Sequence, residues 1–283
     1  MKHNSPRHLS FIHWKSCHCL LYCSLVCEKY LRAMTRPSLV ATFLMRNEPE
    51  RKIYDRGYVR SLFDSIAFRY DFLNHALSAG LDVLWRKRAI GFLQPFHPQH
   101  ILDVATGTAD LAVESARTLG SIVVGVDLSQ EMLRIGRSKI ESMGLSSRIT
   151  LIEGTAEELT FADKSFDAVT AAFGVRNFTD LRQGLAEMYR VLKTGGAAVI
   201  LEFSRPSNRI VDKFFGFYFK HVLPVVGGFI SGNAEAYRYL PKTVGEFPAG
   251  LDFLSILHKV GFNETIQYPL TLGIATIYIG IKR

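Results

Sequence analysis

Cysteine is nearly absent from this chain of 283 residues. All four cysteines lie close to its beginning, at Cys17, Cys19, Cys23 and Cys27. Their spacing lacks the paired Cys-x2-Cys steps of structural zinc sites, and no cysteine elsewhere offers a disulfide partner. We therefore expect neither a metal site nor a disulfide framework, as is typical of a large intracellular fold.

Long apolar runs are missing as well. The longest stretch without Asp, Glu, Lys or Arg covers residues 265–281, a run of 17 that contains Pro269 and Gly273. A helix that crosses a bilayer needs about 20 apolar residues, so we expect no membrane-spanning segment. The β-branched residues on both sides of Gly273 predict a hairpin of two strands instead.

Acidic residues are scarce at the beginning of the chain. Residues 1–46 contain seven Lys or Arg and one acid, Glu28, so most of the net charge of +8 lies there. The remaining chain carries too small a positive excess to favour nucleic-acid binding. Because residues 1–46 have no helical or strand period, we interpret them as a disordered or non-native extension, with translation starting at Met34 or Met45. A secretory signal and an organellar transit peptide are the alternatives.

From residue 101 onward, short apolar runs alternate with helical patterns. Strands are expected at residues 101–104, 121–127, 148–153, 166–173 and 197–203, and helices at residues 110–119, 130–143, 180–192 and 251–260. Ser129 is expected to cap the second helix, and Gly195-Gly196 to end the third. The alternation predicts an α/β fold, with a mostly parallel sheet covered by helices and an antiparallel terminal strand at its edge. Residues 47–283 then form one domain with an apolar insertion at about 204–247.

The loop after the first expected strand lacks the Gly-x-Gly-x-x-Gly fingerprint, because Gly107 is the only glycine in residues 103–110. This argues against an NAD-dependent oxidoreductase. Asp127 ends the second strand, where a carboxylate can accept both hydroxyls of a ribose. Residues 154–157 form a third loop that can frame an adenine. S-adenosylmethionine (SAM), a nucleoside cofactor without pyrophosphate, fits this pattern; the alternative is that Gly107 only permits tight packing and Asp127 only caps a helix.

Several segments resemble the ubiquinone/menaquinone biosynthesis C-methyltransferases. They are residues 63–74 (FDSIAFRYDFLN), 84–87 (LWRK), 102–111 (LDVATGTADL), 173–177 (FGVRN), 188–196 (MYRVLKTGG), 201–204 (LEFS) and 237–241 (YRYLP). The resemblance covers the chain from about residue 50 to its end. It implies a class I SAM-dependent methyltransferase fold, which is Rossmann-like with a seven-stranded sheet, and methylation of a ring carbon on a prenylated hydroquinone.

The resemblance also implies which residues hold SAM. The cofactor contacts are expected at Thr108, Asp127, Thr155 and Ala156, with Gly107 and Asp103 in the first loop completing the site. Relatives usually have asparagine where this chain has Thr155, so an amide contact is lost there. They commonly have serine where it has Ala172, so a hydroxyl contact is lost too.

Carbon methylation requires an electron-rich ring, which a quinol becomes when a phenolic proton is removed. Arg176 lies just past the fourth expected strand, and its guanidinium stays protonated, so we expect it to stabilise the quinolate oxygen rather than act as a base. Asn177 is expected to orient a water that takes the proton, and Tyr70 to bind the second ring oxygen. The alternatives are a structural ion pair between Arg176 and Glu202 and a core position for Tyr70.

Two histidines, His75 and His221, are further candidates for a base, although isolated histidines are more often structural. Demethylmenaquinol is the favoured acceptor, and a polyprenyl benzoquinol of ubiquinone biosynthesis is the alternative. A non-catalytic protein that binds SAM or a quinol is the alternative from another class. The sequence leaves homo-oligomerisation open.

The insertion has a composition typical of a membrane boundary. Aromatic residues lie there beside cations. The aromatic residues are Phe214, Phe215, Phe217, Tyr218 and Phe219, and the cations are Arg205, Arg209, Lys213 and Lys220. A prenylated substrate resides in lipid, so we expect a cytoplasmic enzyme that contacts the inner face of the membrane peripherally. An organellar location requires that residues 1–46 are a genuine transit peptide. The alternative for the aromatic residues is a lid helix that buries them over the sheet.

Overall fold

The structure is a computed structural model that describes residues 55–206, 208–218, 221 and 234–283. The predictions for residues 1–46, and those for Phe219 and Lys220, lie outside the described residues and stay predictions. In the described ranges, no helix is both long and apolar enough to cross a membrane.

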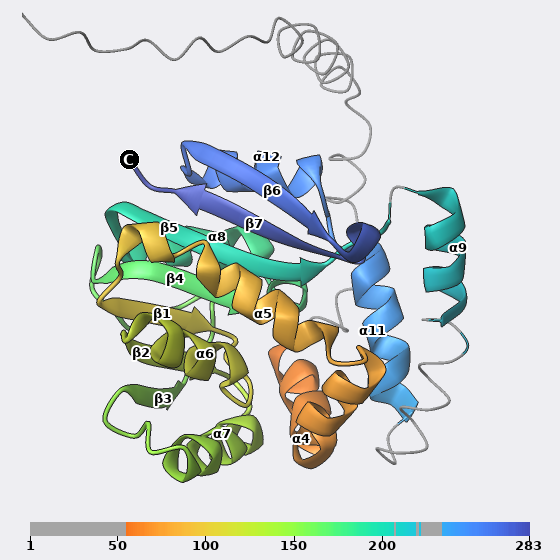
Figure 1. Cartoon of the computed structure of the whole chain (residues 1–283), viewed down its shortest axis with the longest axis horizontal. Coiled ribbons are helices and arrows are strands. Elements are labelled where there is room, and N and C mark those ends of the chain that lie inside the picture. Colours follow the sequence, from red (N-terminus) through yellow and green to blue (C-terminus); the bar gives the residue numbers. More distant parts are fainter. Residues whose placement is uncertain (1–54, 207, 219–220, 222–233) are drawn as a thin grey trace, which may run out of the picture. The chain divides into compact units, whose positions relative to one another are not determined.

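Seven strands form one sheet in the order β3-β2-β1-β4-β5-β7-β6 (Figure 1). They are β1 (His100–Val104), β2 (Ile122–Asp127), β3 (Ile149–Glu153), β4 (Phe166–Ala172), β5 (Leu192–Phe203), β6 (Glu264–Leu270) and β7 (Ala275–Ile281). Strands β1 to β5 pair in parallel, whereas β7 runs antiparallel to both β5 and β6. The predicted mostly parallel sheet with a terminal antiparallel strand and hairpin is confirmed.

The position predicted for the antiparallel strand is wrong. Strand β7 lies inside the sheet, between β5 and β6, and β6 forms the edge. The residues explain this order, because β7 is buried along nearly its whole length while β6 alternates between exposed and partly buried positions. A strand that is apolar on both faces needs neighbours on both sides, and a half-exposed strand that contains Pro269 suits an edge.

Two groups of helices cover the sheet. The helices are α4 (Arg56–Leu77), α5 (Leu81–Gly91), α6 (Asp110–Leu119), α7 (Gln130–Ser142), α8 (Leu181–Val191), α9 (Arg209–Phe217), α11 (Ala234–Glu246) and α12 (Leu251–Val260), with short 3-10 turns η2 (Gln94–Phe96), η3 (Val175–Asn177) and η5 (Thr271–Gly273). Helices α5, α6 and α7 pack into the hydrophobic core on one face, and α8 and α12 into the core on the other. Ser129 caps α7 by accepting a hydrogen bond from the N–H of Met132, as predicted.

The glycine pair predicted to end the third expected helix lies inside β5 instead. Helix α8 ends at Val191, and β5 begins at the next residue. The pairing of β4 with β5 shifts register between Phe166 and Ala168, so the added residues of β5 form a bulge. Gly195 has φ +82°, and a Cβ on Gly196 would lie 2.6 Å from the carbonyl oxygen of Asp167. Both glycines therefore serve the bulge rather than a helix end.

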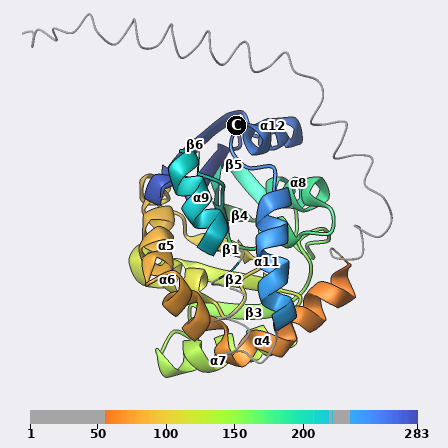
Figure 2. The same cartoon turned by 90° about the vertical axis from the view of Figure 1, so that its right-hand side faces the viewer.

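Three helices lie at the carboxyl ends of the parallel strands. Figure 2 shows α4, α11 and α9 on that side of the molecule. Helix α4 precedes the sheet, whereas α9 and α11 belong to the insertion between β5 and α12. Leu62 and Leu73 of α4 form a third apolar cluster with Met132 of α7 and Tyr239 of α11. The helices thus enclose the end of the sheet where α/β proteins bind their ligands.

Candidate functional site

The first pocket opens at the switch point of the sheet. Strands β1 and β4 are neighbours, while the helices that follow them, α6 and α8, pack on opposite faces. Open α/β sheets bind ligands in the crevice that this reversal creates. The pocket is lined by the loops after β1 to β4 and by α4, including Gly107, Asp127, Thr155, Ala156, Ala172, Phe173, Asn177, Phe63 and Tyr70.

Gly107 and Asp127 form the polar wall of the first pocket. Gly107 has φ +55°, and its N–H donates to Oδ2 of Asp127 at 2.8 Å. The N–H of Ser129 donates to Oδ1 at 2.9 Å. Burial raises the pKa of Asp127, while these backbone bonds favour its charged form. Each carboxylate oxygen has a further lone pair, so the group can still accept two ribose hydroxyls.

Two predicted cofactor residues do not line this pocket. The hydroxyl of Thr108 donates to Asp71 on α4. Asp103 is fully buried, where it accepts hydrogen bonds from Thr106 at 2.6 Å and Thr170 at 2.8 Å. These hydrogen bonds fix the first loop against α4 and β4. Both side chains therefore support the conformation of the loop without lining the pocket.

Asp103 makes stability depend on pH. Burial raises its pKa to about 6, despite hydrogen bonds from Thr106 and Thr170 that favour the charged form. Because an unfolded Asp has a pKa of about 3.9, this contribution to stability is fully present below pH 4 and is lost as the pH rises through 6. We expect wild type to lose about 2 kcal/mol relative to Asp103→Asn between about pH 4.5 and about pH 7.5, measured by urea unfolding. If the unfolding free energies of wild type and Asp103→Asn changed by the same amount over this pH range, that result would contradict the expectation.

The fourth loop meets both the third and the first loops at close range. Thr155 and Ala156 line the first pocket, and the buried Glu157 beside them accepts a hydrogen bond from the N–H of Thr179 at 2.7 Å. A Cβ on Gly174 would lie 2.5 Å from Cβ of Ala105 in the first loop. The loops after β1 and β4 can therefore touch only because Gly174 has no side chain.

A larger second pocket adjoins the first. Its volume is ≈ 180 Å³, against ≈ 70 Å³ for the first pocket. Most of its walls are apolar, including Leu62, Ile66, Leu77, Leu81, Trp85, Phe203, Phe215, Leu240 and Ile274. Phe63, Tyr70 and Phe173 line both pockets, so these residues form the boundary between them. Burial raises the pKa of the Tyr70 phenol, although the nearby Arg176 opposes that shift.

Arg176 lines the second pocket and is paired with a buried acid. Its Nη1 donates to Oε1 of Glu202 at 2.7 Å and to the carbonyl oxygen of Phe173. The side chains of Arg176 and Glu202 are 5% and 0% exposed. Nε of Arg176 is buried and has no hydrogen-bond partner among the described residues, and the guanidinium lies 5.5 Å from the ring centroid of Phe203. The structural ion pair between Arg176 and Glu202, which was the alternative, is therefore present. Arg176 makes this ion pair and also lines the second pocket.

Of the other predicted catalytic residues, Asn177 and Tyr70 line a pocket, whereas the two candidate histidines do not. Asn177 lines the first pocket and accepts a hydrogen bond from the hydroxyl of Tyr239 at 3.1 Å, whereas Tyr70 faces both pockets. His221 is exposed, lies 5.1 Å from the ring centroid of Phe217 and lines neither pocket. His75 lies beside the second pocket and contacts the pocket's acid, Asp82.

Two charged residues that line the second pocket were not predicted as site residues. Asp82 and Arg86 of α5 are both buried and form an ion pair. Arg86 also lies 5.6 Å from the ring centroid of Phe173. The sequence carried a signal for them, because Asp82, Trp85, Arg86 and Ala89 recur on one helical face with an acid–base pair four residues apart.

Comparison with known proteins decides the family. The ubiE/COQ5 methyltransferase family model matches residues 50–282. The chain belongs to this family. A demethylmenaquinone methyltransferase from Porphyromonas gingivalis is 48% identical over 226 residues, which are 79% of this chain and 92% of the relative. A ubiquinone/menaquinone biosynthesis C-methyltransferase UbiE from Geotalea daltonii is 47% identical over 234 residues, covering 82% and 99% of the two chains.

Solved structures support the fold of this ubiE/COQ5 methyltransferase. A SAM-dependent methyltransferase from Thermotoga maritima has a TM-score of 0.55 at 20% identity, over 79% of this chain and 99% of that one. The [4+2]-cyclase SpnF also has a TM-score of 0.55, at 19% identity over 77% of both chains. Such distant similarity shows the fold alone, and the cyclase illustrates that one fold hosts different chemistry. The resemblance and the class I methyltransferase fold are confirmed, and the enzyme uses SAM as its methyl donor.

Proposed function

We propose that this enzyme transfers the methyl group of SAM to a ring carbon of demethylmenaquinol, which yields menaquinol. The adjoining pockets support the proposal most directly, because a carboxylate-containing pocket of nucleoside type shares a wall with an apolar pocket. Relatives that are 46–48% identical carry the name demethylmenaquinone methyltransferase. Similar relatives are named for ubiquinone as well as menaquinone, so a polyprenyl benzoquinol is the second candidate.

The residues of the first pocket fit SAM. When bound, SAM supplies an electrophilic methyl group that needs no metal. Asp127 accepts the ribose hydroxyls through its remaining lone pairs, and the backbone at Thr155 and Ala156 frames the adenine. Tyr70 and Phe173 separate this pocket from the second one. They hold the substrate ring and the methyl group at the short distance that an in-line displacement requires.

The residues of the second pocket favour the anionic quinol. Arg176 stabilises negative charge on the ring oxygen next to the reacting carbon, in a pocket whose apolar walls exclude water. Fixed positive charge is most effective where water is excluded. Tyr70 donates a hydrogen bond to the other ring oxygen, and its buried phenol stays protonated because its pKa is raised. Asn177 holds its place through Tyr239 and orients a water at the pocket boundary.

A comparison of two acceptors tests the proposed substrate. The enzyme would be assayed with SAM and short-chain naphthoquinol or benzoquinol analogues under reducing conditions. We expect a kcat/KM at least tenfold higher for the naphthoquinol. A preference for the benzoquinol would assign the enzyme to the ubiquinone branch, and cofactor binding without methyl transfer to either would indicate a non-catalytic protein.

Helix α9 supports peripheral docking on a membrane. Phe215 and Tyr218 line the second pocket, whereas Ile210, Phe214 and Phe217 are exposed, Phe214 to 73%. Three exposed cations lie nearby, at Arg205, Arg209 and Lys213. An apolar helix face beside cations is typical of helices that lie in the headgroup region. The same helix thus provides pocket wall and docking face.

Exchanging the exposed aromatic residues tests the docking face. We expect Phe214→Ser/Phe217→Ser to lower co-sedimentation with phosphatidylglycerol vesicles at least fivefold, because two exposed aromatic side chains that would insert into the lipid are lost. The control is Met143→Ser, which removes a side chain of 48% exposure at the end of α7. Equal binding of the double variant and wild type, or no binding of wild type, would contradict docking through α9.

A further inference from the structure

One carboxylate stands out in the wall of the second pocket. Among the described residues that line it, Asp82 is the only acid. The other ionisable groups are the cations Arg86 and Arg176 and three phenols. Among the described lining residues, Asp82 therefore provides the only anionic proton acceptor for a ring in this pocket.

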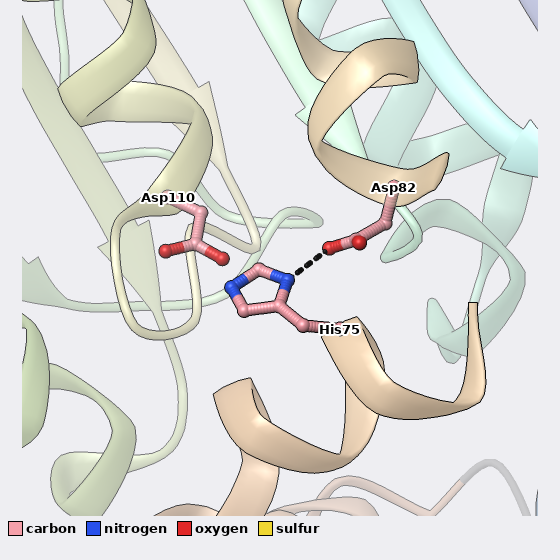
Figure 3. Close-up of side chains that lie close together, drawn as sticks. All are labelled: His75, Asp82 and Asp110. Atoms are coloured by element: carbon pink, nitrogen blue, oxygen red, sulfur yellow. Dashed lines mark hydrogen bonds and ion pairs between the residues drawn. The ribbon is translucent and has the colours of Figure 1, made fainter. Parts of the chain in front are cut away.

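Asp82 connects the pocket with a partly exposed histidine. Its Oδ2 lies 2.7 Å from Nδ1 of His75, and its Oδ1 accepts a hydrogen bond from Ser78 at 2.7 Å. The Asp82 side chain is 4% exposed, whereas that of His75 is 40% exposed. Figure 3 shows the imidazole between the carboxylates of Asp82 and Asp110. The imidazole thus bridges a buried acid and the solvent.

The surrounding charges favour a proton path over a metal site. His75, Asp82 and Asp110 are close enough together to ligate one ion. However, Arg86 already pairs with Asp82 and lies 3.5 Å from Asp110, and Lys139 lies 2.5 Å from Asp110. Metal binding would have to displace these cations.

The charged cluster that includes the acids beside His75 comes from four helices. Its members are Asp71 on α4, Asp82 and Arg86 on α5, Asp110 on α6 and Lys139 on α7. Three carboxylates and two fixed cations leave one net negative charge while the imidazole is neutral. An added proton on His75 makes the whole cluster neutral, so the cluster accommodates a proton in transit.

The proposed reaction must dispose of one proton, and this step rests on the proposed function. A phenolic O–H bond breaks, and the electron pair moves through the ring to form the bond from carbon to the methyl group. The bond from methyl to sulfur breaks at the same time, and its electron pair stays on sulfur in the neutral demethylated cofactor. The ring C–H bond then breaks and its electrons restore aromaticity, while the phenolic oxygen regains a proton. One hydrogen on carbon is replaced by methyl, so one proton is released per turnover. Apolar walls cannot carry it away.

We propose that Asp82 and His75 form the outlet for this proton. The Asp82 carboxylate takes the proton at the ring oxygen and passes it to Nδ1 of His75, which is free to accept it in the Nε2–H tautomer. Nε2 then releases its own proton to solvent, and proton exchange with solvent restores the starting tautomer. Burial opposes ionisation of Asp82, yet hydrogen bonds from Ser78 and Arg86 hold its pKa below the usual value. Asp82 consequently passes a proton on rather than retaining it.

The variant His75→Gln tests the outlet, because glutamine keeps a hydrogen bond to Asp82 but cannot shuttle protons. In single-turnover methylation of a short-chain demethylnaphthoquinol, we expect a rate about 10- to 100-fold below wild type. The pH–rate profile of the variant should differ in shape from that of wild type, because proton release no longer passes through an imidazole. In His75→Ala, added imidazole should restore the rate several-fold. The control His258→Gln alters an exposed histidine on α12 and should match wild type.

Three outcomes would overturn the outlet. They are a His75→Gln rate within twofold of wild type, an unchanged pH profile, or a slow His75→Ala that does not respond to imidazole and binds quinol more weakly. The last result would identify His75 as a structural residue that positions Asp82. Failure of the outlet is distinguishable from failure of the proposed function, since only the latter abolishes methylation by wild type.

Discussion

Replacing Arg176 with alanine is expected to lower the single-turnover rate of methyl transfer by about 10²- to 10³-fold, the effect of losing one charge-stabilising donor in a water-poor site. The guanidinium is held in the wall of the second pocket by Glu202 and by the carbonyl oxygen of Phe173. It is therefore already in place when negative charge develops on the ring. The affinity for SAM should change little, since Arg176 does not line the first pocket.

The same substitution leaves Glu202 as a buried charge without its partner. Because Glu202 is 0% exposed, we expect the free energy of unfolding to fall by about 3–5 kcal/mol. The variant Arg176→Lys separates the two effects, because it keeps a cation beside Glu202 but loses the planar fork of the guanidinium. It should fold nearly as stably as wild type and still be at least tenfold slower. Added guanidinium ion should partly rescue folded Arg176→Ala. A rate within twofold of wild type in Arg176→Lys, together with no rescue, would remove Arg176 from the mechanism.

Replacing Asp127 with asparagine is expected to weaken SAM binding by about 100-fold or more. Hydrogen bonds to a charged group contribute about 1.5–3 kcal/mol each, and in the proposed function two ribose hydroxyls donate to this carboxylate. In wild type the carboxylate accepts hydrogen bonds from the N–H groups of Gly107 and Ser129. In the variant the NH₂ group of the amide faces one of these donors, so that hydrogen bond is lost. Calorimetry with SAM and with its demethylated product measures the change. At saturating SAM, kcat should stay within a few-fold of wild type.

Glu153→Gln is the matched control for Asp127→Asn. Glu153 ends β3 as Asp127 ends β2, and the two residues pair in adjacent strands. However, Glu153 contacts Arg60 and Gln130 and does not line the first pocket. SAM affinity should be unchanged in the control. An Asp127→Asn affinity within threefold of wild type would show that ribose recognition does not depend on this carboxylate.

Local signals predicted the parallel part of the fold and much of the first pocket. The strand lengths place Gly107 and Asp127 at adjacent strand ends, and Ser129 has the side chain that an N-cap needs. These features depend on residues close together in the sequence. The position of β7 was missed because strand order depends on pairing between distant segments, and the bulge in β5 was missed because a glycine pair also ends helices.

The second pocket could be predicted only in fragments. Its walls come from α4, α5, the ends of β4 and β5, α9, α11 and the turn before β7. No local pattern brings such segments together. The bond from Thr108 to Asp71 has the same origin, because it depends on how α4 lies over the first loop. The sequence named Arg176 as a site residue and Glu202 as its alternative partner, but only the tertiary structure shows that Arg176 makes this ion pair and also lines the second pocket.

The most direct test follows the methyl group itself. The enzyme would be incubated with SAM carrying a ¹³C-labelled methyl and a short-chain demethylnaphthoquinol under reducing conditions, and the product examined by NMR. We expect one label on the ring carbon next to a phenolic oxygen, with one demethylated cofactor formed per product. Label on oxygen, or intact SAM in the presence of both bound ligands, would contradict this expectation.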